Sequence, residues 1–219
     1  MITISKEDYL KAVLEAESEG EHVISATLAH WLKVSAPAVT MALRRLKRDG
    51  LVSVRADGRV ELTAEGRQIA RRTVVRHHLI ERMLHEVFGM EWWRVHDEAE
   101  RLEHAVSADF EAKLAEKLGQ TGNCPHGNPL TPISAAARRK RGMRLLAEAE
   151  EGKRYMVNSV YERDGNLLEF LDQHGIRPGA RLRVLTRGYD QTLTLETAAG
   201  QVILGSPAAE KVWLTPAVK

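Results

Sequence analysis

Apolar residues recur at helical spacing through the first fifty residues of the chain. They predict a first helix over residues 6–18 and two more over 26–34 and 36–50. The apolar stripe of the first helix consists of Tyr9, Leu10, Val13 and Leu14. Ser25 and Ser35 stand where N-caps are expected, so each should accept a hydrogen bond from the first turn that follows it.

The apolar period changes to two after Gly50. In LVSVRADGRVELT, apolar and polar residues alternate on both sides of Asp57-Gly58. This pattern predicts a β-hairpin with a type I′ turn, which requires positive φ at both central residues. Three short helices followed by a hairpin is the order of a winged helix-turn-helix domain.

The middle of the chain again has helical spacing. A helix is predicted over residues 64–88, between a capping Thr63 and Gly89, and a second over 92–107. Residues 131–151 form a charged helix or linker, in which Arg138 to Arg141 are expected on a solvated face.

The C-terminal part returns to a period of two. Strands are predicted in YMVNSVYER, RLRVLTRG, TLTLETAAG and QVILG, with a helix in LLEFLDQHGIRPG. These elements would form a small barrel of about 65 residues. Glu162, in the first of these segments, is expected on the surface of a strand.

Composition indicates an ordinary soluble protein. Hydrophobic residues make up 43% and charged residues 28% of the 219 residues, and no apolar run reaches 18 residues, so no membrane span is expected. The start of the chain carries acidic residues early and lacks the apolar core of a signal peptide. A single cysteine, Cys124, excludes an internal disulfide and fits a cytoplasmic protein.

The net charge of +2 hides an uneven distribution. Residues 33–76 hold eleven lysines and arginines against four acidic residues, a local balance of +7. A polyanion is the natural partner of such a segment, and the predicted winged helix points to double-stranded DNA. The alternative is that the arginines only form a solvated helix face.

The third predicted helix is the one expected to enter the major groove. Its small and apolar first turns suit contacts with base edges, while its arginines suit phosphates. The expected DNA-contacting residues are Ser35, Ala36, Pro37, Ala38, Thr40, Met41, Arg44, Arg45 and Arg48.

Imidazole and carboxylate groups share faces of the two middle helices. His77 and Glu81 are four residues apart, and a second face of the same kind holds four residues. That second face consists of His96, Glu100, Glu103 and His104. If the helices pack together, the six groups can bind one or two divalent ions. The alternative is an exposed face with ordinary pairs such as Glu98–Arg101.

Motifs of other metal and nucleophile chemistry are incomplete. His85-Glu86 begins a zinc-protease motif, but Gly89 stands where the second histidine should be. A di-iron Glu-x-x-His pair is absent because Arg101 precedes His104 by three residues. Cys124 and His126 have no activating context in the sequence. No enzyme activity is therefore expected.

Several segments, taken together in their order, resemble the diphtheria-toxin-repressor family of iron- and manganese-dependent transcriptional regulators. The similarity covers nearly the whole chain. The segments are EDYLKAV, SAPAVTMALRRLKRDGLV, LTAEGRQIA, RHHLIERML, VHDEAERLEH and CPHGNP.

The resemblance implies two metal sites. One would use Asp8 with Glu100, Glu103 and His104, and the other would use His77, Glu81 and His96. Asp8 and Glu100 correspond to the manganese-type ligand set, whereas iron-type members usually carry Met and Cys at these positions. Lys11 departs from the manganese type, which usually places another Glu there, and this favours two separated sites over a closely spaced dinuclear one.

The sequence as a whole therefore predicts a mainly α fold with small β parts. Its domains would be a winged helix-turn-helix at 1–73, a helical metal-binding and dimerisation domain at 74–150 and an SH3-like barrel at 151–219. The expected function is that of a homodimeric repressor of metal-uptake genes, activated by one or two Mn²⁺ or Fe²⁺ ions per subunit. The alternatives are a repressor that senses a small organic ligand and a metalloenzyme that carries a DNA-binding domain.

Overall fold

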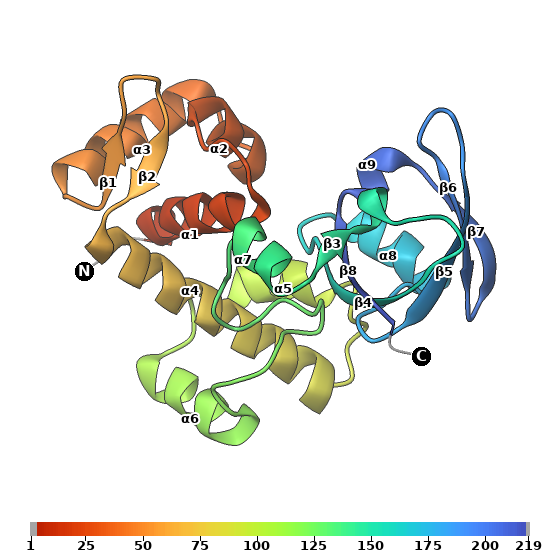
Figure 1. Ribbon diagram of the computed structural model, residues 1–219. Helices are drawn as coiled ribbons and strands as arrows, with labels where there is room; N and C mark the ends of the chain where they lie inside the picture. Colours follow the sequence, from red (N-terminus) through yellow and green to blue (C-terminus); the bar gives the residue numbers. More distant parts are fainter. Residues whose placement is uncertain (1–3, 218–219) are drawn as a thin grey trace. The chain divides into compact units, whose positions relative to one another are not determined.

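The computed structural model describes residues 4–217 (Figure 1). It divides into two compact units, one formed by the chain up to His77 with Leu130–Ala136, the other by His78–Pro129 with the chain from Ala137. Helices dominate up to Leu118 and strands dominate from Arg144, which confirms the predicted mainly α fold with small β parts. None of the helices within residues 4–217 is long and apolar enough to cross a membrane.

The first unit contains the predicted helices and hairpin. In chain order its elements are α1 (Ile4–Glu19), α2 (Ser25–Leu32), α3 (Ala36–Arg48), β1 (Val52–Val54) and β2 (Val60–Leu62). The two strands pair antiparallel, with Val54 opposite Val60. The three helices bury their apolar faces together, with Leu10, Leu28 and Val39 fully enclosed. The winged helix-turn-helix order is thus present, as Figure 1 shows in red and orange.

The two predicted N-caps have different outcomes. Ser35 caps α3, where its side chain accepts a hydrogen bond from the Ala38 N–H at 3.4 Å. Ser25 is not a cap, because α2 begins at this residue. The Thr27 hydroxyl instead accepts from the Ile24 N–H at 3.4 Å, which satisfies a donor at this helix end.

The hairpin prediction is correct but its turn type is wrong. Gly58 has a φ of +84°, whereas Asp57 does not adopt positive φ, so the turn is not type I′. The Gly58 N–H donates to the Arg55 carbonyl at 3.0 Å and closes a turn that ends in this single left-handed residue. The longer loop leaves the strand pairing unchanged.

The first long middle helix matches its prediction. α4 (Ala64–Arg82) continues as one π-helical stretch, η1 (Met83–Val87), and Gly89 follows with a φ of +68°. Thr63 accepts the Gly66 N–H at 3.1 Å, as a cap should. A Cβ at Gly66 would lie 2.0 Å from the Leu51 carbonyl oxygen, so only glycine fits where this helix starts.

The prediction of a second middle helix over residues 92–107 is wrong in its extent. The structure has α5 (Val95–Leu102), a turn, and then a separate α6 (Ala108–Leu118). Ser107 caps α6 by accepting the Phe110 N–H at 3.2 Å. That cap breaks the helical run, and Glu103 and His104 consequently lie in the turn rather than on the helix.

The C-terminal strands form the predicted barrel. The sheet order is β3-β8-β4-β5-β6-β7, with every pair antiparallel. The strands are β3 (Arg144–Leu145), β4 (Arg154–Val160), β5 (Arg181–Arg187), β6 (Leu193–Thr197), β7 (Gly200–Leu204) and β8 (Val212–Pro216). The helical elements are α7 (Ala135–Lys140), η2 (Leu146–Glu148), α8 (Gly165–Gln173) and α9 (Ser206–Ala209). β8, which sequence interpretation missed, pairs with both β3 and β4.

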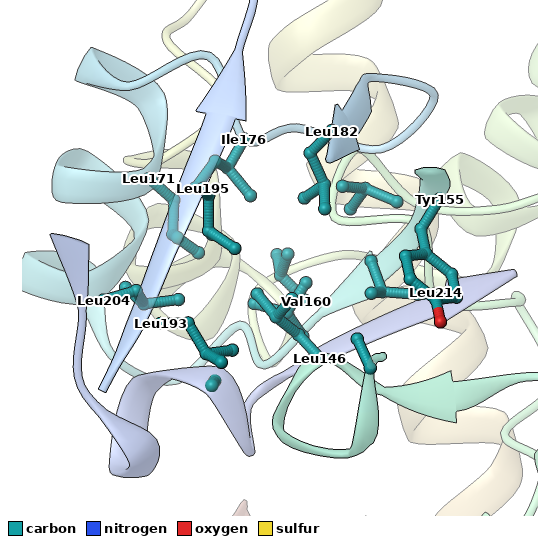
Figure 2. Packing of buried hydrophobic residues seen from close by; sticks show 14 of the residues in the cluster. Leu146, Tyr155, Val160, Leu171, Ile176, Leu182, Leu193, Leu195, Leu204 and Leu214 are labelled. Carbon is teal, nitrogen blue, oxygen red and sulfur yellow. The ribbon is translucent and has the colours of Figure 1, made fainter. Parts of the chain in front are cut away.

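Inward-facing side chains of these strands make one hydrophobic core (Figure 2). Leu193, Leu195 and Leu214 are fully buried, and Ile176 after α8 joins them. Trp92, from the segment before α5, packs into the same core and makes a short hydrogen bond with Asp172. The barrel is therefore continuous with part of the helical segment that precedes it in the sequence.

Candidate metal centre

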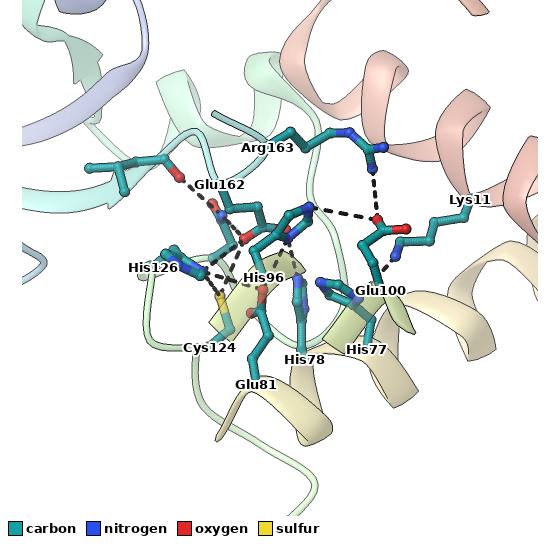
Figure 3. Close-up of polar contacts among 12 residues, drawn as sticks. Lys11, His77, His78, Glu81, His96, Glu100, Cys124, His126, Glu162 and Arg163 are labelled. Atoms are coloured by element: carbon teal, nitrogen blue, oxygen red, sulfur yellow. Dashed lines mark hydrogen bonds and ion pairs between the residues drawn. The ribbon is translucent and has the colours of Figure 1, made fainter. Parts of the chain in front are cut away.

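A cluster of ionisable side chains is buried inside the second unit (Figure 3). Glu81 comes from α4 and Glu162 from the segment directly after β4, whereas Cys124 and His126 come from one loop. Glu81 and His126 are 0% exposed, Cys124 is 4% and Glu162 8% exposed. Burial of two carboxylates is costly unless positive charge compensates them.

The loop is tightly folded. The Cys124 N–H donates to the Asn128 carbonyl at 2.8 Å, and the Gly127 N–H donates to the Cys124 carbonyl at 2.9 Å. Gly127 has a φ of +83°, and a Cβ there would lie 2.0 Å from the Asn158 carbonyl oxygen. Glycine is thus required twice over, by its backbone conformation and by the close approach of β4.

Four ligand atoms converge in this cluster. One atom each from His78, Glu81, Cys124 and Glu162 lies within 4.8 Å of all the others. The His78 Nε2 lies 3.2 Å from one Glu162 oxygen, and the Cys124 Sγ lies 3.4 Å from the other. Imidazole, carboxylate and thiolate groups at such separations form a donor set that fits a divalent transition-metal ion.

His126 adds a fifth donor with a defined orientation. Its Nε2 is held 2.8 Å from the Trp92 carbonyl oxygen, to which only an N–H can donate. Its Nδ1 lies 3.4 Å from a Glu81 oxygen and 3.6 Å from a Glu162 oxygen. In a neutral ring the Nδ1 would carry a lone pair that faces the oxygens of both carboxylates, and these groups repel one another. A proton or a metal ion between the Nδ1 and the carboxylates would remove this repulsion.

The electrostatics of the cluster show the same need for a cation. Burial and the Glu81 charge act to raise the pKa of Glu162, but its interactions with His78 and His96 outweigh them and hold that pKa well below its usual range. Burial lowers the pKa of His126, yet the Glu81 and Glu162 carboxylates raise it above its ordinary value. The raised pKa of His126 favours a proton between the two carboxylates, and a divalent ion bound there would displace that proton.

The environment of Cys124 favours the protonated thiol. Burial, followed by the charges of Glu81 and Glu162, raises the pKa of the Cys124 thiol well above its ordinary value. A reactive cysteine needs the opposite environment. The Cys124 Sγ lies 3.8 Å from the His126 Nδ1, but the raised pKa of the thiol does not favour a thiolate, whereas coordination to a metal ion would deprotonate it.

Neighbouring side chains hold these donor groups in place. The Asn128 amide donates to Glu162 Oε2 at 2.6 Å, and its oxygen accepts from Arg138 at 3.3 Å. Arg138 is 4% exposed and lies over the Trp213 ring at 5.2 Å. The predicted solvated face of residues 138–141 is therefore wrong for Arg138, which supports the cluster through Asn128.

Three of the residues predicted as ligands meet within the second unit. The His96 Nδ1 lies 3.1 Å from Glu81 Oε1, and its Nε2 lies 3.6 Å from Glu100 Oε1. Glu100 also accepts a hydrogen bond from Arg163 at 3.2 Å. His96 is buried, so the alternative of a wholly exposed face does not hold, although the exposed Glu98–Arg101 pair exists at 2.9 Å.

The other predicted ligands are divided between the units. Glu103 is fully buried, and its Oε1 lies 3.4 Å from the His104 Nε2. Asp8 on α1 is half-buried and belongs to the first unit. His77 is buried in the first unit, where its Nδ1 lies 3.0 Å from the Lys11 ammonium nitrogen. Lys11 is itself only 2% exposed.

Sequence interpretation missed several members of the buried cluster. Glu162 was expected on the surface of a strand but is buried, and Cys124, His126 and His78 were not expected near Glu81. The CPHGNP segment did carry a signal, because it holds two metal-binding residue types and a glycine within four residues. Their partner Glu162 is 36 residues away from His126, a separation that no periodicity connects.

The predicted DNA-contacting residues are all on the surface of α3 and its N-cap. Ser35, Ala36, Pro37, Ala38, Thr40, Met41, Arg44, Arg45 and Arg48 are all exposed. Val39, Leu43 and Leu46 face the core instead. The helix is therefore amphipathic, with a basic outer face free of core packing.

Three families of domains match the chain in order. Residues 1–60 match the N-terminal DNA-binding domain of the iron dependent repressor, and residues 63–132 match its metal binding and dimerisation domain. Residues 144–216 match the FeoA domain.

Relatives match over most of their length. The chain is 33% identical to the iron-dependent repressor IdeR of Mycobacterium leprae, covering 95% of this chain and 91% of the relative. It is 34% identical to the diphtheria toxin repressor of Corynebacterium efficiens over 82% of each chain.

Solved structures of similar proteins match as well. A manganese-dependent transcriptional repressor solved in complex with manganese superposes with a TM-score of 0.84 at 34% identity, covering 97% of this chain and all of the other. The manganese regulator SloR gives 0.80 at 28% identity, with 97% and 98% covered. The chain belongs to the diphtheria-toxin-repressor family of metal-dependent transcriptional regulators and carries a C-terminal FeoA domain of SH3-like fold.

Proposed function

We propose that this protein is a DNA-binding transcriptional repressor activated by Mn²⁺ or Fe²⁺, and that it represses metal-uptake genes when loaded. The observation that supports metal binding is the buried donor set of His78, Glu81, Cys124 and Glu162, whereas the switch itself is assigned to the set with Asp8. It occurs in a chain whose basic α3 is capped and exposed. Relatives named as iron-dependent and as manganese-dependent repressors support the same function.

The proposal assigns two donor sets. The first is the buried cluster, in which His96 and His126 lie beside Glu81 and Glu162. The second is the predicted set of Asp8, Glu100, Glu103 and His104, with its members drawn from both units. His77 remains a proposed ligand through its place four residues before Glu81 on α4, although Lys11 shares a hydrogen bond with it. Each set would hold one ion per subunit.

The metal would act by joining the two units. A bound ion that needs Asp8 of the first unit together with Glu103 and His104 of the second favours one arrangement of the two. In a dimer that arrangement fixes the spacing of the two α3 helices, which must match major grooves about 34 Å apart. DNA and metal then stabilise the same state, so each tightens the binding of the other by the same factor.

We further propose a homodimer and the domain bounds 1–73, 74–150 and 151–219. Residues 63–132 match a dimerisation domain, and this segment exposes large apolar side chains at Val87, Phe88 and Phe110. Phe88 is 70% exposed. Exposed aromatic and aliphatic groups of this kind are typical of interfaces.

The test is the affinity for operator DNA as a function of free Mn²⁺. A duplex selected from random sequence in the presence of Mn²⁺ serves as the operator. Affinity should rise with Mn²⁺ and fall when a chelator is added, by about 5- to 150-fold if the coupling is of ordinary size. Unchanged affinity after chelation would refute metal activation. A response to a small organic molecule in metal-free buffer would favour the organic-ligand alternative.

A further inference from the structure

A basic groove opens on the barrel at the end remote from Glu162 along β4. It has a volume of about 880 Å³ and is lined by the first residues of β4 and β5 and by the segments around them. Five of its lining residues are cationic: Arg144, Lys153, Arg154, Arg181 and Arg183. Only Glu150 and Glu196 oppose them, which leaves a formal excess of three positive charges.

The strand register concentrates these charges on one face. Arg154 on β4 pairs directly with Arg183 on β5, and Arg181 is opposite Met156, two positions further along. Tyr155 and Leu182 between them point into the core, so the three arginines share the outer face. Like charges directly opposite each other destabilise a sheet. Glu196 on β6 faces Arg183 from the other side and offsets part of this cost, and a bound anion would offset the rest.

Most of these cations lack a carboxylate partner. Arg144 pairs with Glu150 at 3.1 Å, and the Arg183 Nε donates to the Gly152 carbonyl at 3.4 Å. Lys153, Arg154 and Arg181 form no ion pair with any residue from 4 to 217. Elsewhere on this unit, exposed arginines commonly have such partners, as Arg139 has in Glu148 at 2.7 Å.

We propose that this groove binds a compact phosphate chain, such as that of a nucleoside polyphosphate or an inorganic polyphosphate. Guanidinium groups bind phosphate oxygens through paired, charge-assisted hydrogen bonds, and three of them on one face suit several adjacent phosphates. The volume is within the range of about 300–1,000 Å³ of small-molecule sites, whereas a helical nucleic acid needs an open surface. This site involves neither the metal ligands nor α3.

The test is calorimetric titration of the metal-free full-length protein with sodium tripolyphosphate, ATP and adenosine. Metal must be absent because phosphate chains bind divalent ions themselves. Tripolyphosphate and ATP should bind at one site per chain, and adenosine should not bind. Stronger binding of ATP would identify a nucleotide as the ligand, and equal binding would identify the phosphate chain alone. If adenosine binds as well as ATP, the phosphate proposal is wrong.

The variant Arg154→Ala/Arg181→Ala should weaken tripolyphosphate binding about tenfold or more, since two charge-assisted contacts are lost. The matched control is Arg94→Ala/Arg101→Ala, which removes the same charge from exposed pairs with Glu91 and Glu98 and should leave the affinity within about twofold. Lys153→Ala, in the turn before β4, provides a second variant in case the double substitution impairs folding.

Two results would overturn the proposal. One is equal weakening by the groove variant and its charge-matched control, which would show a non-specific charge effect. The other is a loss of random-sequence duplex DNA binding in the groove variant by the same factor as tripolyphosphate binding, which would make the face a nucleic-acid surface.

Discussion

The two proposed donor sets differ in where their residues come from. Glu81, Cys124, His126 and Glu162 all belong to the second unit and are held within it by hydrogen bonds. The set with Asp8 takes one ligand from the first unit and the rest from the second. Metal binding to the first set can proceed without any change between the units, whereas metal binding to the second depends on how they are arranged. The first set is therefore suited to stability and the second to switching.

Their donor atoms also differ. The set with Asp8 offers three carboxylates and one imidazole, which suit Mn²⁺ and Fe²⁺. The buried cluster replaces one carboxylate by the Cys124 thiol, which is a softer donor that shifts preference towards Zn²⁺ or Fe²⁺. The set with Asp8 would therefore favour Mn²⁺ and Fe²⁺, whereas the buried cluster would favour Zn²⁺ or Fe²⁺.

The largest effect is expected from Gly127→Ala. The new Cβ would lie 2.0 Å from the Asn158 carbonyl oxygen, so the loop that holds Cys124 and His126 must move. We expect a loss of about 2–4 kcal/mol in the free energy of unfolding, measured by urea denaturation, and loss of metal from the buried cluster.

Gly142→Ala is the matched control for this substitution. Gly142 has a φ of +80°, close to that of Gly127, but open space around it, so it tests backbone conformation alone. Its cost should be about 1 kcal/mol. Equal losses in the two variants would show that the contact with Asn158 does not restrict the loop.

Glu103→Ala should abolish the response of operator affinity to Mn²⁺, a loss of about 1–3 kcal/mol of coupling. The fold and the weak non-specific binding to DNA should remain, because α3 is unchanged. Fluorescence anisotropy with operator and with random duplex measures both. Glu98→Ala, which removes an exposed carboxylate paired with Arg101, is the control. A normal Mn²⁺ response in Glu103→Ala would remove Glu103 from the site.

Cys124→Ser should separate the two sets. The serine keeps the shape but offers a harder and weaker donor, so Zn²⁺ affinity at the buried cluster should fall by about 10- to 100-fold. The Mn²⁺ response of DNA binding should change little, in contrast to Glu103→Ala. Competition with a chromophoric chelator measures the first property and anisotropy the second. Loss of the Mn²⁺ response in Cys124→Ser would show that the two sets do not work independently.

How much of this was predictable from sequence depends on the range of the interactions. The α3 helix is specified locally by Ser35, by Pro37 in the first turn and by its apolar stripe, and its prediction was correct. The pair of His96 with Glu81 was also accessible, since both residues lie on predicted helices. The turn at Asp57-Gly58 was misjudged because the local sequence is compatible with more than one turn type.

The contacts of Glu162 and Arg138 were beyond such reasoning. Glu162 follows a strand in which alternation suggests an exposed position, and only the packing of that strand against the Cys124 loop buries it. Arg138 belongs to a basic run that resembles a solvated face, yet Asn128 and Trp213 enclose it. In both cases the partners are brought together by tertiary packing, which residue spacing does not encode.

The smallest effect concerns the dependence of stability on pH. The pKa of His126 is raised in the metal-free protein, so its protonated form is favoured by folding. That contribution is fully present below the unfolded value of about 6.5 and is lost as pH rises through the higher folded pKa. Stability of the metal-free protein, measured by urea denaturation, should therefore fall as pH rises from about 6 to 8.

His126→Gln, which keeps a polar group in the loop, should flatten the slope of the unfolding free energy against pH. Bound Mn²⁺ should reverse it, because the ion requires the unprotonated ring and competes better with protons as pH rises. The same slope with and without Mn²⁺ would show that His126 and the ion do not share one site.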